Sequence, residues 1–370
     1  MIKQDKKLRI GLLFGGQSGE HEVSLTSAQS VMQAIDLTKY EIIPIGISKT
    51  GQWLTGENVH QQLLEAAGEH PMLAGQGTGT RQSHHSLALS LPQTGPLDLI
   101  FPVLHGTYGE DGKIQGLLEL LNLPYVGAEV TASAVCMDKV LSKEVFRAHG
   151  LPIVIFRAFL QKQWQTNPDT VLDECEAAMP YPMFVKPANL GSSVGIHKAK
   201  NRTELEAGLN DAVRYDRKVI VEQGLEAREI EVSVLGNDEP QASVPGEVIP
   251  SREFYSYAAK YLEESKMLIP APLNEEQTSM IQQLAIMAFQ ALDCVGLARC
   301  DFFVEKETGE IFVNELNTMP GFTPLSMYPK LWAASGLSYS DLLDRLIELA
   351  LARHQEKQTL QTSFDVATAQ

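Results

Sequence analysis

The fold class is indicated most clearly by one stretch of sequence, MFVKPANLGSSVGIHK, at residues 183–198. A short apolar run ends at Lys186 and Pro187, and a loop of small residues follows between Gly191 and Gly195. The N–H groups of such a loop can surround phosphate oxygens, and a lysine on the adjoining strand can supply a point charge. By itself the loop is more typical of a flexible turn after an edge strand. The chain contains neither a Walker A loop nor a GxGxxG fingerprint.

Upstream of this stretch, buried strands alternate with helices. Apolar runs at 8–16, 41–48 and 97–106 predict strands, and the patterns at 19–35 and 112–124 predict helices. This order predicts a parallel sheet with crossover helices, in a first domain that ends near residue 125. Most of residues 60–97, which include a patch rich in Gly, Thr, Ser and His, is interpreted as a loop.

Downstream of the first domain, the pattern changes. Residues 131–150 are interpreted as one linking helix that ends at Gly150. Short strands then recur between residues 153 and 236, which favours an α+β domain with antiparallel pairs. An amphipathic helix at 274–292, a hairpin at 296–317 and a closing helix at 338–355 complete the expected order.

Composition excludes several classes of function. The chain has 370 residues and a formal net charge of −16, which argues against sequence-independent binding to nucleic acid but leaves room for a local basic pocket. Its longest apolar runs fall far short of the ~18 residues that a membrane-spanning helix needs. The four cysteines have no metal-binding spacing and are typical of buried thiols in a reducing compartment. We therefore expect a cytoplasmic protein.

The hairpin at 296–317 carries the first candidate site. A turn near Thr308 would place Arg299 opposite Asn317 and Asp301 opposite Glu315. Two facing carboxylates repel by roughly 3 kcal/mol at ~5 Å and an effective dielectric constant of ~20. Oxygen ligands of this kind suit a hard cation such as Mg²⁺, although a solvated face of an edge hairpin is an equal alternative. The neighbouring arginine favours a site that handles a carboxylate or a phosphate.

Other polar residues stand at strand ends. Glu222 ends an apolar strand and could hold a ribose hydroxyl, and Lys139 lies in a helix, where a solvated lysine is the default. Glu22 follows the glycine turn at 15–16, and His105 ends the third strand, where α/β sheets bind ligands. An ordinary structural role is the more common one for each residue alone. Together they are the residue types that an enzyme uses to transfer a phosphoryl group by electrostatic stabilisation and positioning.

The segment REFYSYAAKYLEES, residues 252–265, is aromatic and charged and has no clear periodicity. It includes Lys260 and Tyr261. Such a segment is typical of a lid that closes over a substrate, and the alternative is a surface Ω-loop.

These motifs together resemble the D-alanine–D-alanine ligases of the ATP-grasp superfamily. The resemblance rests on FGGQSGEHEVSL, LHGTYGEDGKIQGLLELL, MDK, KPANLGSSVG, AAKY and RCDFF…NELNTMPGFTPLS, in this order between about residues 8 and 350. It implies a Rossmann-like, pre-ATP-grasp substrate-binding domain at 1–125, followed by a two-lobed ATP-grasp fold. The expected lobes are residues 126–225 and 226–355, the latter with the metal site, and residues 356–370 form a tail.

The family activity that this resemblance implies is the joining of two D-alanine molecules for peptidoglycan. ATP phosphorylates the carboxylate of the first, and the amine of the second attacks the acyl phosphate. Ten residues would hold nucleotide and metal. They are Lys139 and Lys186 for the α- and β-phosphates, Glu222, Gln223 and Leu225 for the adenosine, Glu229 for the ribose, Lys260 for the transferred phosphate, and Asp301, Glu315 and Asn317 for two Mg²⁺ or Mn²⁺ ions.

The first D-alanine would be held by residues from four motifs. Glu22 would bind its ammonium group, and His105 would lie near its carboxylate. Ser192 and Tyr261 would complete a hydrogen-bonded network with Glu22. The lid around Tyr261 would protect the acyl phosphate from water.

The resemblance assigns the remaining roles to the second half of the chain. Arg299 and the N–H of Gly321 would stabilise the tetrahedral oxyanion, and Ser326 with the N–H of Met327 would hold the second carboxylate. The pair Lys260–Tyr261 favours an amine as the second nucleophile, because related ligases that use D-lactate lack it.

Two alternatives stay open at this point. One is another ATP-grasp ligase that joins a carboxylate to a different amine, such as a D-alanine–D-serine ligase. The other is a nucleotide-binding regulatory module without turnover. A homodimer is expected on the resemblance alone, whereas activation by K⁺ and the choice between Mg²⁺ and Mn²⁺ stay open.

Overall fold

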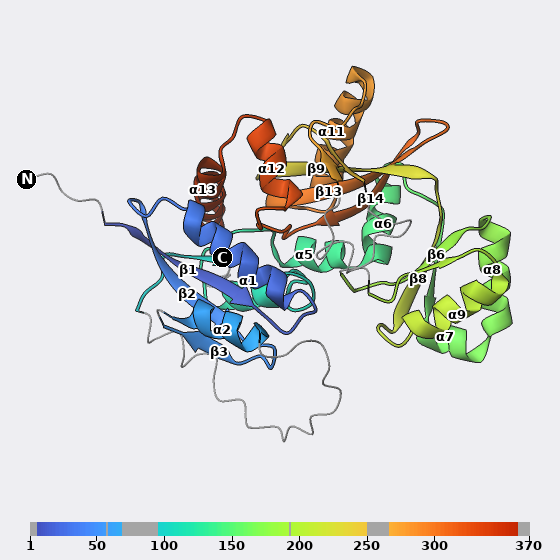
Figure 1. Cartoon of the computed structure of the whole chain (residues 1–370), viewed down its shortest axis with the longest axis horizontal. Helices are drawn as coiled ribbons and strands as arrows, with labels where there is room; N and C mark the ends of the chain where they lie inside the picture. Colours follow the sequence, from blue (N-terminus) through green and yellow to red (C-terminus); the bar gives the residue numbers. More distant parts are fainter. Residues whose placement is uncertain (1–5, 57, 69–94, 192–193, 250–265, 362–370) are drawn as a thin grey trace, which may run out of the picture.

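The computed structural model describes residues 6–56, 58–68, 95–191, 194–249 and 266–361. Three sheets follow one another along this part of the chain, each with its own helices (Figure 1). The lid segment at 252–265 and the tail beyond residue 361 lie outside the described residues. Among the helices that are described, none is long and apolar enough to cross a membrane.

The N-terminal sheet has the order β3-β2-β1-β4. Its parallel strands are β1 (Leu8–Gly15), β2 (Tyr40–Ile47) and β4 (Leu99–Pro102), and β3 (Trp53–Thr55) is antiparallel to β2. The helices of this region are α1 (His21–Ala34), α2 (Val59–Gly68) and α4 (Lys113–Leu120). The expected parallel sheet with crossover helices is therefore confirmed.

The interpretation of residues 60–97 as mostly loop is wrong for its first part, which forms α2. Val59 and Leu63 are one helical turn apart, and both are buried. A Cβ placed on Gly46 of β2 would lie 2.6 Å from Leu63 Cδ1, so the helix packs directly on the sheet. A helix of ten residues gives little periodicity, so it is difficult to recognise beside the Gly- and Ser-rich residues that follow it. Residues 69–94 lie outside the described part of the chain.

The linking helix predicted at 131–150 is two helices, α5 (Val130–Met137) and α6 (Lys139–Ala148). Asp138 interrupts them with an extended backbone, and its side chain accepts hydrogen bonds from the N–H groups of Val140 and Leu141, both at 3.1 Å. This is an N-cap, which explains why the helix restarts there. Lys139 consequently begins α6 instead of lying in the middle of a longer helix.

The central sheet is antiparallel and has the order β5-β8-β6-β7. Its strands are β5 (Phe156–Leu160), β6 (Met183–Pro187), β7 (His197–Ala199) and β8 (Lys218–Gln223). Three helices share one hydrophobic core with these strands, and none of them was predicted from the sequence. They are α7 (Gln161–Thr166), α8 (Pro168–Ala178) and α9 (Arg202–Ala212). They lie together at one end of the molecule (Figure 1).

The third sheet has the order β12-β11-β9-β13-β14, and β10 pairs with β9. Its strands are β9 (Ala227–Gly236), β10 (Gln241–Ala242), β11 (Gly246–Ile249), β12 (Lys266–Leu268), β13 (Gly296–Glu305) and β14 (Ile311–Asn317). The predicted hairpin register is confirmed, because Arg299 pairs with Asn317 and Asp301 pairs with Glu315. Helix α11 (Glu275–Ala291) packs on this sheet.

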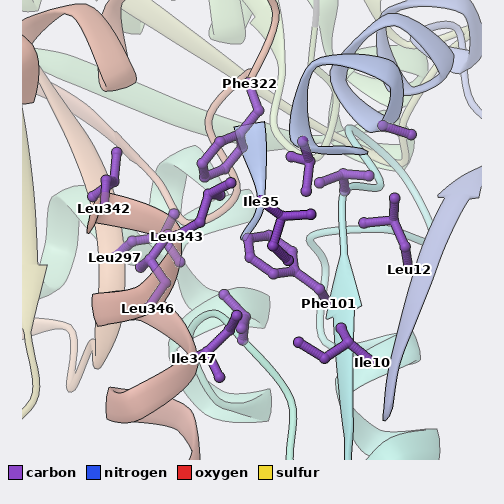
Figure 2. Packing of buried hydrophobic residues seen from close by; sticks show 14 of the residues in the cluster. Ile10, Leu12, Ile35, Phe101, Leu297, Phe322, Leu342, Leu343, Leu346 and Ile347 are labelled. Carbon is purple, nitrogen blue, oxygen red and sulfur yellow. The ribbon is translucent and has the colours of Figure 1, made fainter. Parts of the chain in front are cut away.

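The last two helices join the third sheet to the first. Helices α12 (Met327–Ala334) and α13 (Tyr339–Gln358) share one buried cluster with β1 and β4 (Figure 2). Phe322 belongs to this cluster, and its ring centroid lies 5.9 Å from that of Phe101 in an edge-to-face arrangement. This packing fixes the carboxyl ends of the N-terminal strands beside the segment that follows β14.

Gly15→Ala is expected to destabilise the fold by about 2 kcal/mol or more. Gly15 has a φ of +92°, and a Cβ there would lie 2.1 Å from the carbonyl oxygen of Ile47. The measurement is chemical denaturation followed by circular dichroism. The matched control is Gly19→Ala, where a Cβ has no atom within 4 Å. Equal stability of the two variants would contradict the close approach of β1 to β2.

Candidate active site

A buried ion cluster lies at the end of the central sheet. Glu222 at the end of β8 contacts Lys186 of β6 at 2.5 Å and Lys143 of α6 at 2.9 Å, from separate carboxylate oxygens. Lys143 also donates a hydrogen bond of 3.0 Å to the carbonyl oxygen of Asn314 in β14. The side chains of Lys143 and Glu222 are 1% and 2% exposed, so the pair is removed from water. The cluster thus connects the central sheet to the third sheet.

Burial and charge oppose each other at these groups. Burial alone would raise the pKa of the Glu222 carboxyl, but the two lysines outweigh it and lower the pKa to about 2. Burial lowers the pKa of Lys143, and the charge of Lys186 lowers it further, because the attraction of Glu222 does not outweigh them. The pKa of Lys186 is instead raised, because the attraction of Glu222 exceeds the cost of burial. Lys186 is therefore positively charged at neutral pH.

The second cluster lies on the hairpin of β13 and β14. The guanidinium of Arg299 binds both carboxylate oxygens of Asp301 at 2.7 Å and reaches Glu231 of β9 at 3.0 Å. Asn317 donates a hydrogen bond of 3.0 Å from Nδ2 to Asp301. Burial would lower the pKa of Arg299, but Asp301 and Glu231 outweigh it and raise the pKa.

Lys139 joins the two clusters to the glycine loop. Its ammonium lies 3.4 Å from Glu315 Oε2 and donates a hydrogen bond of 3.0 Å to the carbonyl oxygen of Leu190. Asp216 accepts hydrogen bonds from both nitrogens of Asn189, at 2.8 Å and 3.0 Å, which anchors the start of the loop. Lys139 thus places a cation against both the hairpin and the start of the loop, which suits contact with a polyphosphate.

The hairpin also fits a divalent cation in its donor chemistry. Asp301 and Glu315 face each other across the ladder, and the side-chain amide of Asn317 lies beside Asp301, to which its Nδ2 donates. Over the described residues, no group of three His, Cys, Asp or Glu side chains could hold a metal ion. Two carboxylates and an amide are a sparse set for Mg²⁺, which typically completes its shell with water and substrate phosphates. The residues therefore fit a metal that arrives with a nucleotide.

The N-terminal sheet contributes a polar network at its carboxyl edge. His105, which is buried, contacts Ser27 Oγ through Nε2 at 3.0 Å and the carbonyl oxygen of Met319 through Nδ1 at 3.0 Å. Ser27 Oγ also accepts a hydrogen bond of 3.2 Å from the N–H of Phe322. His105 and helix α1 are thereby fixed against the segment that follows β14.

Glu20 is the buried acidic residue of this edge. Its side chain is 7% exposed, and it lies against two glycines of different sheets. A Cβ on Gly106 would lie 2.8 Å from Glu20 Oε2, and a Cβ on Gly191 would lie 3.4 Å from it. The carboxylate therefore stands where the glycine loop meets the N-terminal sheet.

A tight turn precedes α12. The hydroxyl of Ser326 accepts a hydrogen bond of 3.0 Å from the N–H of Thr323 and lies 2.8 Å from the hydroxyl of Thr323. A Cβ on Gly321 would lie 2.6 Å from Ser326 Oγ, so only glycine fits beside the serine. Ser326 is the N-cap residue of α12, and its side chain makes no capping hydrogen bond to the helix. This hydroxyl can thus serve a ligand without uncapping a helix.

Comparisons with known proteins agree with this arrangement. Family models described as "D-ala D-ala ligase N-terminus" and "D-ala D-ala ligase C-terminus" match residues 9–128 and 145–348. A curated D-alanine–D-alanine ligase from Natranaerobius thermophilus is 49% identical, over 97% of this chain and 99% of that protein. The chain belongs to the D-alanine–D-alanine ligase family.

Solved structures show the same fold. The D-alanine–D-alanine ligase of Coxiella burnetii has a TM-score of 0.77 and 40% identity, and the alignment covers 95% of this chain and 96% of that one. The VanG D-Ala:D-Ser ligase of Enterococcus faecalis has a TM-score of 0.79 and 36% identity, with 93% and 100% covered. The expected ATP-grasp fold with its N-terminal α/β domain is therefore correct.

Most residues that the family resemblance assigns to ATP and metal lie together. Direct contacts join them in two groups, one of Lys186 with Glu222 and one of Lys139 with Glu315, Asp301 and Asn317. Lys143, which contacts Glu222 and the carbonyl oxygen of Asn314, connects the two groups. Gln223, Leu225 and Glu229 follow on β8, the next turn and β9, and all three are partly exposed. Ser192, Lys260 and Tyr261 lie outside the described residues.

Glu22 does not lie with this D-alanine–D-alanine ligase site. Its side chain is exposed and forms an ion pair with Lys49. Partial burial would raise the pKa of the Glu22 carboxyl, but the contact with Lys49 outweighs it and lowers the pKa. The reason is helical phase, because residues 20 and 22 differ by about 200° around a helix axis. Glu20 shares the buried face of Ser24 and Ser27, whereas Glu22 shares the exposed face.

The sequence contained a signal for Glu20. Glu20, Ser24 and Ser27 follow the spacing i, i+4, i+7 of one helix face. The sequence interpretation also missed Lys143 and Glu231. Lys143 stands four residues after Lys139, so the same α6 face carries both. Glu231 lies directly across from Asp301 in the pairing of β9 with β13.

Proposed function

We propose that this protein joins two D-alanine molecules to D-alanyl-D-alanine at the junction of the three sheets, with conversion of ATP to ADP and phosphate. Membership of the D-alanine–D-alanine ligase family carries the reaction. The observation that supports its location is the continuous set of charged side chains from Lys186 to Asp301. The product serves the synthesis of peptidoglycan precursors.

The triphosphate lies along the lysines. Lys139 and Lys186 bind its α- and β-phosphates, and the loop that starts at Asn189 closes over them. Gln223 and Leu225 frame the adenosine, and Glu229 binds the ribose. The carboxylate of Glu222 does not bind the adenosine, which is the role that the resemblance assigns to it. Its two oxygens instead contact Lys143 and Lys186.

Glu20 takes the role that the sequence suggests for Glu22. It binds the ammonium group of the first D-alanine, and His105 lies near the carboxylate of that molecule. Glu20 adjoins Gly106 and Gly191, so an amino acid held there lies between the N-terminal sheet and the phosphate loop. Ser192 and Tyr261 remain proposed members of this network on the family resemblance.

The two chemical steps use these positions in sequence. An oxygen of the first carboxylate forms a bond with the γ-phosphorus as the bond to the β–γ bridging oxygen breaks, and ADP leaves. The amine of the second D-alanine, after losing a proton, then attacks the acyl carbon, and phosphate leaves as the C–O bond breaks. Arg299 and the N–H of Gly321 stabilise the oxyanion of the tetrahedral intermediate. Lys260 reaches the transferred phosphoryl group.

Asp301, Glu315 and Asn317 would hold two Mg²⁺ ions, or Mn²⁺ ions in their place. When bound, these cations supply neutralisation of the phosphate charge that builds up during transfer. Within this chain, the guanidinium of Arg299 fixes the carboxylate of Asp301, and the ammonium of Lys139 lies against the carboxylate of Glu315. Removal of divalent ions with a chelator should abolish turnover.

We also propose that the protein forms a homodimer, on the family resemblance, and sedimentation velocity measures this oligomeric state.

Ser326→Ala should raise the KM for the second D-alanine roughly ten- to hundredfold, since a hydroxyl that binds a carboxylate contributes about 1.5–3 kcal/mol. Ser326 and the N–H of Met327 hold that carboxylate. The KM values for ATP and for the first D-alanine should stay within about twofold, which initial-rate kinetics measures. A uniform rise in all KM values would remove Ser326 from the second-substrate site.

The experiment that tests the proposed function offers Mg-ATP with D-alanine, L-alanine, D-serine or D-lactate, singly and in pairs. Phosphate release is followed, and the product is identified by mass spectrometry. We expect release with D-alanine alone and the mass of D-alanyl-D-alanine. Release only with a pair of D-alanine and D-serine would reassign the second substrate, and nucleotide binding without release would indicate a non-catalytic module.

A further inference from the structure

Lys143 has no role in the proposed reaction, yet it lies at the centre of the nucleotide site. Its ammonium is 1% exposed and is held between Glu222, at 2.9 Å, and the carbonyl oxygen of Asn314, at 3.0 Å. Asn314 directly precedes Glu315 on β14. The side chain thus touches the strand end that frames the base and the strand that carries a metal ligand. Both contacts are made to groups of the protein itself.

A buried lysine needs a reason, because burial of its charge costs several kcal/mol before any partner is counted. A hydrophobic residue of similar length would fill the same space and often gives equal or higher stability. Met183 of β6 and Phe146 of α6 show that both flanking elements already supply buried apolar side chains. Lys143 is therefore poorly explained by packing alone.

The net charge of the ion cluster supplies a reason for the burial of Lys143. Lys143, Lys186 and Glu222 are two cations and one carboxylate, so the cluster has a net charge of +1. Without Lys143, Glu222 would neutralise Lys186, and the net charge facing the phosphates would be zero. Glu229 and Glu315 also attract Lys186 electrostatically, which increases the need for compensation.

We propose that Lys143 is a positioning residue for ATP: it occupies one oxygen of Glu222, so that Lys186 keeps a surplus positive charge for the triphosphate. Its hydrogen bond to Asn314 fixes the same cluster to β14. Lys143 does not touch the nucleotide. It acts through Glu222 on Lys186, and through Asn314 on the strand that carries Glu315.

The inference rests on the proposed function and makes a prediction about charge that a packing role does not make. Lys143→Met reduces the net charge of the cluster to zero and should raise the KM for ATP about tenfold, which corresponds to about 1.4 kcal/mol. The KM values for D-alanine should stay within about twofold. The double variant Lys143→Met with Glu222→Gln restores a net charge of +1 and should bring the KM for ATP back to within about threefold of the wild type. Lys143→Arg keeps the charge and should behave as the double variant does.

The matched control is Lys357→Met. Lys357 is also shared between two groups, Glu119 at 2.8 Å and Glu129 at 3.0 Å, but it belongs to α13 and contacts none of the nucleotide residues. It should leave the KM for ATP unchanged, which excludes an effect of the total protein charge. Thermal unfolding is recorded for each variant to separate binding from stability.

Steady-state kinetics with ATP and with D-alanine varied separately decides the matter. A KM for ATP that rises in Lys143→Met and recovers in the double variant supports the proposal. A KM that stays high in the double variant, or that does not change in Lys143→Met, overturns it. Should Lys143→Met not fold, a KM for ATP more than tenfold above wild type in either Lys143→Arg or the double variant also overturns it. Dipeptide formation by the wild type is measured first, so that failure of the proposed function is recognised separately.

Discussion

Glu315→Gln is expected to lower kcat about a thousandfold or more while the protein stays folded. Glu315 faces Asp301 across the hairpin, and two carboxylates at this spacing repel unless a cation lies between or beside them. Removal of one charge weakens the site for a divalent ion, and such ions contribute several kcal/mol of charge stabilisation in phosphoryl transfer. Lys139 also loses its ion-pair partner.

The assay for this variant measures D-alanine-dependent phosphate release at saturating ATP, together with thermal unfolding. Glu310→Gln is the matched control, because Glu310 is an exposed carboxylate just before β14. It should keep full activity. Full activity of Glu315→Gln would remove the hairpin from the metal site and with it the proposed placement of the γ-phosphate.

Glu20→Gln should raise the KM for the first D-alanine about a hundredfold, whereas Glu22→Gln should change it less than twofold. Loss of one partner of a buried charge pair costs roughly 2–5 kcal/mol, and a factor of a hundred corresponds to about 2.7 kcal/mol. Glu20 is buried against Gly106 and Gly191, and Glu22 is exposed beside Lys49.

The two glutamates form a matched pair, because the same substitution is made two residues apart at the start of one helix. Initial rates are measured with D-alanine varied at fixed ATP, and the KM for ATP serves as an internal reference. A large effect of Glu22→Gln with none of Glu20→Gln would restore the role that the sequence suggests for Glu22. It would also mean that the first substrate lies on the outer face of α1.

The hairpin shows what the sequence can predict well. Alternation along two strands, and a short turn between them, are enough to place Arg299, Asp301, Glu315 and Asn317 on one face. The pairing is local, so a few residues determine it. The continuation to Lys139 could not be predicted in this way, because the contact depends on how α6 packs against β14.

Helix α1 shows where a pattern was available but did not decide between two residues. The motif GEHEVS offers two carboxylates, and only the phase of the helix decides which one is buried. Asp138 is a similar case, since a residue that caps a helix can stand inside an apparently continuous helical pattern. In both cases the deciding information is the direction of one side chain.

Lys143 could not be placed from the sequence at all. A lysine four residues after Lys139 in an amphipathic helix is typical of a solvated side chain, yet this one is buried between Glu222 and Asn314, which lie far along the chain on two different sheets. Its environment is created by tertiary packing, and no local rule describes it.

The most direct test of the account uses D-alanine labelled with ¹⁸O in its carboxylate. A phosphoryl transfer to that carboxylate, followed by attack of the second amine, moves one ¹⁸O atom into inorganic phosphate. We predict phosphate with a single ¹⁸O atom, formed in equal amount to D-alanyl-D-alanine and ADP. Unlabelled phosphate, or the release of AMP with the label in it, would contradict an acyl phosphate at this site.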